Sequence, residues 1–190
     1  MRRDKPLSPN SADCRCHWAS GPLLAVARFR AGAAASGTLL GMPGDATDQL
    51  NRFIAKFDPT VAQMIRECRA AMRKRFPTAN ELVYDNYNFF VIGYGPTERP
   101  SDCVASIAAN SKGVNLNFLH GSRLPDPHKI LQGTGGQNRF VRLEGAATLS
   151  KPEVRDLLAV AVAQSESPFP KSGAGKLIIR SVSEKQRPRR

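Results

Sequence analysis

The feature that most constrains the fold is the separation of helical and strand patterns along the chain. Two apolar stripes at helical spacing come first: Leu50, Phe53, Ile54 and Phe57, then Val61, Ile65, Cys68, Met72 and Phe76. Spacings of three and four residues place such side chains on one face of a helix. Asp45 and Thr47 are N-cap candidates for the first helix, and Asp58 followed by Pro59 starts the second. We therefore expect two consecutive amphipathic helices.

Short strands follow from residue 81. We expect them at 82–84, 89–92, 103–109, 114–118 and 140–143. The segment 114–118 alternates apolar residues with asparagine, which is typical of a half-exposed strand. Pro125, Asp126 and Pro127 predict a short helix through Leu131, which the glycines of 133–136 break.

A third helix closes the domain. Ser150 and Glu153 have the spacing of a capping box, and an apolar stripe continues to Ala161. Segregated helices and strands predict an α+β fold: one domain, with N-terminal helices and a C-terminal helix packed on an antiparallel sheet of about five strands. We expect this domain at 45–165 and a basic tail at 166–190, in which 177–182 is a candidate edge strand and 186–190 a disordered end.

Residues 1–41 show no coherent period, and we expect them to be disordered or an upstream extension, with Met42 as the true start. A transit peptide is the alternative, whereas Arg28 and Arg30 interrupt any secretory apolar core. One residue separates Cys14 from Cys16, whereas haem attachment needs two residues between the cysteines. We expect no metal site there and no cofactor elsewhere.

The net charge of +12 is concentrated at the two ends. Residues 1–41 contribute +4, residues 42–165 contribute +3, and residues 166–190 contribute +5. Basic ends attract polyanions without specifying one, so weak, nonspecific nucleic-acid binding through the tails is one hypothesis. No segment approaches the ~18 apolar residues of a membrane span. Cys68 and Cys103 fall on apolar periods, so we expect both to be buried free thiols. Free thiols are typical of a reducing compartment, which favours a cytoplasmic location.

Known catalytic motifs are absent from the sequence. The glycines at 133–136 follow an expected helical turn and open a strand, whereas a phosphate-binding loop has the reverse order, so we interpret them as a turn. Neither Cys68 nor Cys103 has a base nearby in the sequence. We therefore rank a ligand-binding or interaction protein above an enzyme.

The best candidate for a site is a small polar pocket beside the segment from His120 to Arg139. This stretch holds two of the three histidines, several cations and glycines that allow close backbone approach. The candidate ligand-binding residues are Tyr84, Tyr94, His120, Arg123, Asp126, Lys129 and Arg139. Arg139 and Arg142 differ by an odd number in a strand, so only one of them can face the pocket. The alternative is that the glycines make turns and the cations face water.

Five segments in order carry a resemblance: 86–95 (NYNFFVIGYG), 114–121 (VNLNFLHG), 124–127 (LPDP), 131–135 (LQGTG) and 139–143 (RFVRL). Together they resemble the YdhG-like family, a domain of unknown function, over roughly residues 48–163 and again at 176–182. The resemblance implies a small α+β domain with an antiparallel sheet. Some members carry the label of frataxin-like iron chaperones, which is the alternative function here. Frataxin-type iron binding uses an acidic helix face, whereas the helix at 58–76 is strongly basic.

Overall fold

The computed structural model of the protein describes residues 43–190, with side chains from Ala46 onward. The helices are α1 (Pro43–Ile54), α2 (Pro59–Arg75) and α3 (Pro152–Ala163), and the strands are β1 (Asn80–Asp85), β2 (Phe90–Gly95), β3 (Ala105–Asn110), β4 (Gly113–Phe118), β5 (Arg139–Leu143) and β6 (Leu177–Val182). Three short 3-10 helices, η1 (Pro100–Asp102), η2 (Gly121–Arg123) and η3 (Ala146–Ser150), lie in the connections. The expectations for residues 1–41, Met42, Cys14 and Cys16 lie outside the described residues.

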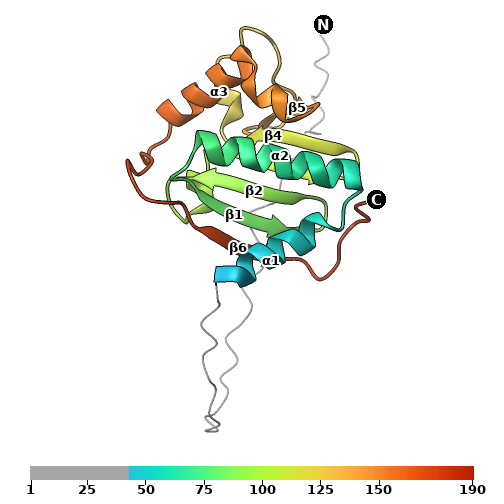
Figure 1. Ribbon diagram of the computed structural model, residues 1–190. Helices are drawn as coiled ribbons and strands as arrows, with labels where there is room; N and C mark the ends of the chain where they lie inside the picture. The colour runs from blue at the N-terminus through green and yellow to red at the C-terminus, as the bar shows by residue number, and fades with distance from the viewer. Residues whose placement is uncertain (1–42) are drawn as a thin grey trace, which may run out of the picture. The chain divides into compact units, whose positions relative to one another are not determined.

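The six strands form one sheet in the order β5-β4-β3-β2-β1-β6 (Figure 1). Strands β1 to β5 pair antiparallel with their neighbours, and β6 pairs parallel with β1. The expected α+β fold with a mostly antiparallel sheet is thus confirmed. The sixth strand, β6, occupies 177–182, the segment that the sequence offered as a candidate edge strand. Its direction differs because the chain crosses back through α3 and residues 164–176 before it reaches the far edge.

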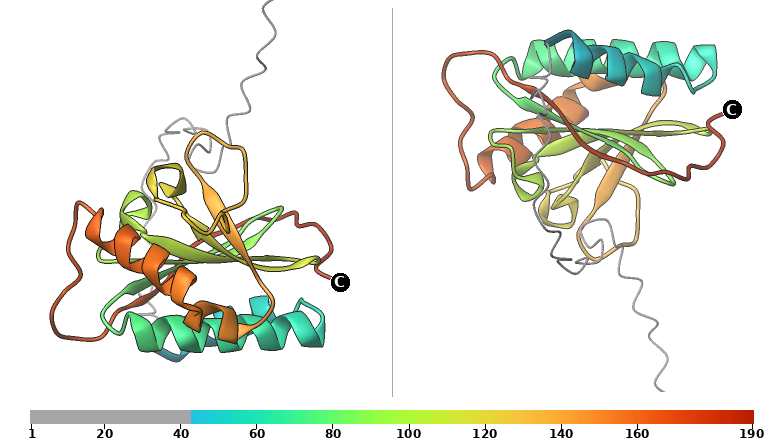
Figure 2. Two further views of the ribbon diagram at one scale, coloured as in Figure 1. Left: turned by 90° about the horizontal axis from the view of Figure 1, so that it is seen from above. Right: turned by 90° about the horizontal axis from the view of Figure 1, so that it is seen from below.

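One face of the sheet carries the core. A row of directly paired apolar side chains crosses all six strands: Ile179, Val83, Ile92, Ile107, Leu116 and Val141. Figure 2 shows α1 and α2 side by side along this face, and the connection from β4 to β5 on the other side of the sheet. Both predicted stripes point inward, since Leu50, Ile65 and Cys68 are fully buried. Burial of each large aliphatic side chain stabilises the fold by roughly 1.5–3 kcal/mol.

The predicted helix caps differ from those in the structure. Asp45 and Thr47 lie inside α1, which begins at Pro43, so neither is its N-cap residue. Asp58 does occupy the N-cap position of α2, but its side chain makes no capping hydrogen bond. The predicted capping box at Ser150 and Glu153 is wrong, because Ser150 belongs to η3 and Lys151 is the N-cap residue of α3. Proline in the first turn of both helices already supplies a suitable backbone angle without a side-chain cap.

The helix expected from Pro125 to Leu131 is also wrong. The Asp126 carboxylate accepts hydrogen bonds from the backbone amides of Ile130 at 3.0 Å and Leu131 at 2.8 Å. Lys129 has a φ of +55°, in the left-handed region, which a right-handed helix does not contain. A side chain that satisfies two nearby amides gives the backbone an alternative to helical hydrogen bonds.

The C-terminal end is ordered, contrary to the expectation for 186–190. Arg189 is only 5% exposed, and the backbone amide of Arg187 donates to the Tyr87 carbonyl at 2.9 Å. The tail is therefore part of the packed domain.

Candidate functional site

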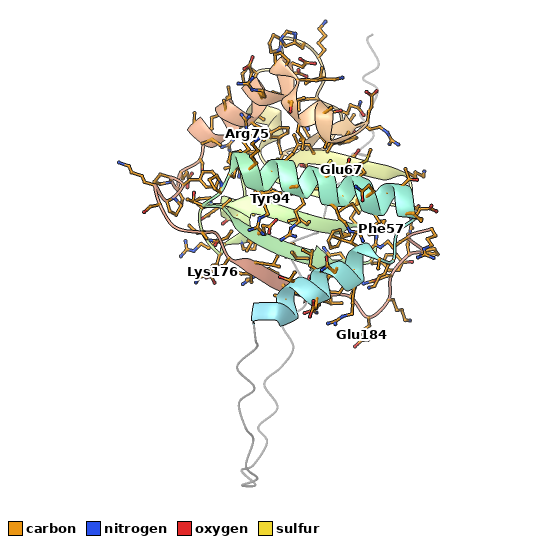
Figure 3. All side chains as sticks on the ribbon, viewed as in Figure 1. Phe57, Glu67, Arg75, Tyr94, Lys176 and Glu184 are labelled. Atoms are coloured by element: carbon orange, nitrogen blue, oxygen red, sulfur yellow. The ribbon has the colours of Figure 1, made fainter. Side chains whose placement is uncertain are left out.

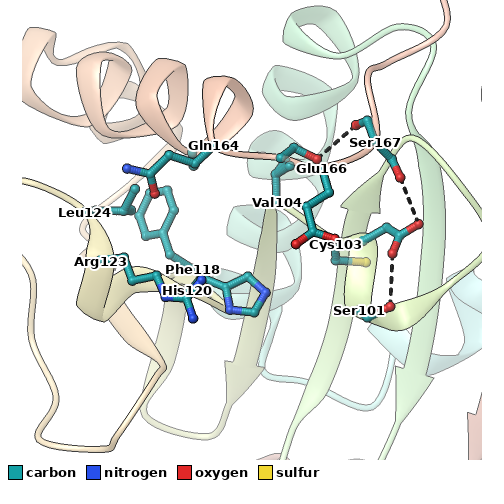
Figure 4. A pocket seen from close by; sticks show the side chains of 13 residues that line it. Ser101, Cys103, Val104, Phe118, His120, Arg123, Leu124, Gln164, Glu166 and Ser167 are labelled. Atoms are coloured by element: carbon teal, nitrogen blue, oxygen red, sulfur yellow. Dashed lines mark hydrogen bonds between the residues drawn. The ribbon is translucent and has the colours of Figure 1, made fainter.

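A pocket of about 600 Å³ opens at one end of the sheet. Three connections build it: the segment between β2 and β3, the segment after β4 with η2, and the chain that leaves α3 (Figure 4). Its apolar lining comes from Val104, Phe118, Leu124 and Ala161, all of them buried. The volume lies in the range of small-molecule sites, and polar side chains make up most of the remaining lining.

Acidic and hydroxyl groups line one wall. The Asp102 carboxylate accepts hydrogen bonds from the hydroxyls of Thr97 at 2.6 Å, Ser101 at 3.0 Å and Ser167 at 3.4 Å. The hydrogen bond from Thr97 contributes most to holding the pKa of Asp102 below its usual value. Glu166 adds a second, exposed carboxylate beside it. This wall is negatively charged at neutral pH.

A cationic group and an imidazole form the opposite wall. Figure 4 shows His120 and Arg123 on one side of the pocket, facing Glu166 and Cys103 on the other. Both come from the turn of η2, in which the amide of Arg123 donates to the carbonyl of His120 at 3.0 Å. Gly121 lets this turn approach β5, because a Cβ there would lie 2.6 Å from the Cβ of Arg139.

Cys103, on the same wall as Glu166, is half-buried and carries a free thiol. Its side chain packs against Gly93, where an added Cβ would lie 2.9 Å from Sγ. Burial, and to a smaller extent the charge of Asp102, raises the pKa of Cys103 to about 12. The thiol is therefore protonated near pH 7 and is a weak nucleophile.

Two of the predicted site residues, His120 and Arg123, line this pocket. The two tyrosines do not share it. Tyr94 is fully buried in the core and pairs with Glu81, three residues from Tyr84. Side chains three apart in a strand point to opposite faces, so Tyr84 lies on the other side of the sheet.

The remaining predicted residues lie outside the pocket lining and have local contacts. Asp126 holds the backbone of Ile130 and Leu131, and Lys129 is exposed. The Arg139 guanidinium donates to the carbonyls of Gly135 and Asn138, and so fixes the loop before its own strand. Arg139 and Arg142 face opposite sides, as their pairing with Phe118 and Asn115 requires.

Sequence reasoning did not find the acidic wall. Asp102 lies over 60 residues from Glu166 and Ser167, and only the fold brings them together. The polar cluster of Thr97, Ser101 and Asp102 was visible in the sequence, but nothing in its spacing identified a partner.

Comparisons with known proteins add no family: no family model, no curated protein and no solved structure matches the chain. The resemblance to the YdhG-like family therefore stays a prediction. Within residues 43–190, no three His, Cys, Asp or Glu side chains gather as a metal site would require. The iron-chaperone function also stays a prediction.

None of the helices in the described part of the chain combines the length and apolar character needed to cross a bilayer.

Proposed function

We propose that this protein binds a small dipolar molecule in the pocket between η2 and the end of α3. The observation that carries the proposal is the opposition of charge across the pocket. Figure 4 shows His120 and Arg123 on one wall and Glu166 on the other, and Asp102 joins the lining through its hydrogen bonds to Ser101 and Ser167. A ligand with a carboxylate or phosphate at one end and an amino group at the other would pair with both walls.

The chemistry of each wall supports this assignment. A guanidinium binds a carboxylate or phosphate through two parallel hydrogen bonds, and an imidazole can add a third donor. The Asp102 carboxylate is already oriented by hydroxyls, so it can accept from an ammonium without first being ordered. The apolar floor of Phe118 and Leu124 fits the middle of a ligand such as an amino acid or a dipeptide.

Binding is favoured over catalysis by the protonation state of the thiol that lines the pocket among residues 43–190. With a pKa of about 12, Cys103 stays protonated at neutral pH. We also propose a cytoplasmic location, because Cys68 and Cys103 are free thiols.

Thermal-shift titration with free amino acids and dipeptides tests the proposal. We expect at least one to raise the melting temperature progressively with concentration, as mass action requires. The same compound with its amino or its carboxyl group blocked should lose most of this effect. Arg123→Gln and Glu166→Gln should each abolish it.

The matched control is Arg66→Gln, which removes an exposed arginine on α2, away from the pocket lining. This variant should keep the full response. The proposal is wrong if no dipolar compound shifts the protein, or if Arg123→Gln responds as Arg66→Gln does.

A further inference from the structure

A second candidate site lies where β1 ends, and a buried carboxylate is at its centre. Asp85, the last residue of β1, has a side chain that is 1% exposed. Lys56 Nζ lies 2.6 Å from its Oδ2, and Arg189 Nη2 lies 3.1 Å from its Oδ1. A carboxylate this deep in the domain needs such partners, because burial without them costs several kcal/mol.

The Arg189 guanidinium lies in a site that offers several hydrogen-bond acceptors to its two terminal nitrogens. Its Nη2 also donates to the carbonyl of Asn86 at 2.6 Å, and its Nη1 donates to the carbonyl of Asn88 at 2.9 Å. The guanidinium carbon lies 5.5 Å from the centre of the Phe57 ring. Three oxygens and an aromatic face thus surround one planar cation, and the Arg189 side chain is 3% exposed.

The backbone of the tail leads Arg189 to this site. The amides of Ser183 and Arg187 donate to the carbonyls of Asp85 and Tyr87, each at 2.9 Å. Gln186 accepts from Lys56 Nζ at 2.9 Å and donates to the Asp85 carbonyl at 3.2 Å. Figure 2 shows this segment passing round the end of the sheet to the C-terminus.

The other two arginines of 187–190 are not recognised in this way. Arg187 is exposed and lies over the Tyr87 ring at 5.6 Å, and Arg190 is exposed with one hydrogen bond to the Ala55 carbonyl. The site therefore selects one arginine of three that lie within four residues.

We propose that Asp85, the carbonyls of Asn86 and Asn88, and Phe57 form an arginine socket, a guanidinium-binding site that the domain uses to dock its own C-terminal segment. The three acceptors come from the end of β1 and the turn that follows it, and the cation comes from the segment after β6. The socket therefore retains its specificity for a guanidinium when Arg189 is removed. It also withholds Arg189 from nucleic-acid phosphates, so a tail that tethers nucleic acid must do so with its other cations or after release from the socket.

Chemical rescue of the full-length chain tests the socket. We expect Arg189→Ala to lower the melting temperature by roughly 6–12 °C, because it leaves Asp85 buried with one partner fewer. Methylguanidinium at millimolar concentration should restore part of this loss, rising with concentration. Methylammonium at equal concentration should restore much less, since it cannot reach the three oxygens together.

Arg187→Ala is the matched control, in the same tail and of the same residue type. It should change the melting temperature little, and methylguanidinium should not raise it. The socket is refuted if the two variants melt alike, if both cations rescue Arg189→Ala equally, or if neither rescues it, since Arg189 would then be an ordinary structural ion pair.

A measurement on the unmodified chain covers the case in which Arg189→Ala does not fold. The guanidinium protons of Arg189 should exchange with solvent at least tenfold more slowly than those of Arg187, as followed by nitrogen-15 NMR. Equal exchange would overturn the proposal.

Discussion

Glu81 and Tyr94 lie directly opposite each other on β1 and β2, beneath α2. The Glu81 carboxylate accepts hydrogen bonds from the Arg69 guanidinium at 2.9 and 2.6 Å, and Figure 3 shows Tyr94 below the same helix. Burial, and then the charge of Glu81, raises the pKa of Tyr94 well above its usual value. Burial alone would lower the pKa of Arg69, but the hydrogen bonds and charge of Glu81 raise it. A charged pair thus ties α2 to the sheet inside the core.

Breaking this pair should be costly. Glu81→Gln removes the charge that compensates Arg69, whose side chain is only 17% exposed. We expect the free energy of unfolding to fall by about 3 kcal/mol, measured by urea denaturation. Glu98→Gln breaks an ion pair with Lys176 in which both groups are exposed to solvent, and should cost much less. Equal losses for the two variants would contradict the buried role of Glu81.

Gly121 and Gly136 should respond in opposite ways to substitution by alanine. A Cβ at Gly121 would meet Arg139 at 2.6 Å, whereas a Cβ at Gly136 meets nothing within 4 Å. We expect Gly121→Ala to lower the free energy of unfolding by about 1–3 kcal/mol and to weaken ligand binding by displacing η2. Gly136→Ala should be neutral or slightly stabilising. Thermal denaturation of both variants checks this; a neutral Gly121→Ala would show that η2 does not pack tightly on β5.

The sequence predicted the elements whose signal is local. The stripe at Leu50 and Phe53 identified the first helix, and alternation at 114–118 identified β4. It did not predict the loop at 125–131, because the Asp126 carboxylate competes with helical hydrogen bonds in a way that residue type alone does not reveal. The burial of Arg189 depends on Asp85, which lies 104 residues away, so local composition indicated only a basic tail.

Half of the candidate site was predictable for the same reason. His120 and Arg123 lie in one short stretch of sequence, and their clustering was visible there. Their acidic counterparts come from two other connections and meet them only after the sheet and α3 have formed. A pocket built from three distant segments leaves no single motif.

Alkaline pH should destabilise the fold through its thiols. The pKa of Cys103 rises from an ordinary 9.0 to about 12 in the folded state, mainly by burial. Between these values the unfolded chain has lost a proton that the folded chain retains, so stability is full below pH 9 and falls as the pH rises. The slope from this group is at most about 1.4 kcal/mol per pH unit.

Cys103→Ala should make the decline above pH 9 shallower in thermal melts recorded from pH 7 to 11. Part of the decline should remain, because burial, and then the charge of Glu67, also raises the pKa of Cys68, to about 11. An unchanged slope in Cys103→Ala would show that the thiol is not desolvated by the fold.

Acid pH should loosen the acidic wall of the pocket. The pKa of Asp102 is lowered, first by the hydrogen bond from Thr97. Its contribution to stability is therefore present above the ordinary carboxyl pKa of 3.8 and is lost as the pH falls through the folded value. Thr97→Val should raise the pKa of Asp102, measured by carbon-13 NMR titration of its carboxyl group. Ser101→Ala should raise it less, and the reverse order would contradict the assignment.

The pocket itself is tested most directly by mapping a dipolar ligand on the nitrogen-15-labelled chain by NMR. With an amino acid or dipeptide that stabilises the protein, we predict that backbone amides in 101–104, 120–124 and 164–167 shift together and follow one saturation curve. Shifts confined to the basic face of α2 or to the tail, with these three segments unmoved at saturation, would contradict the account.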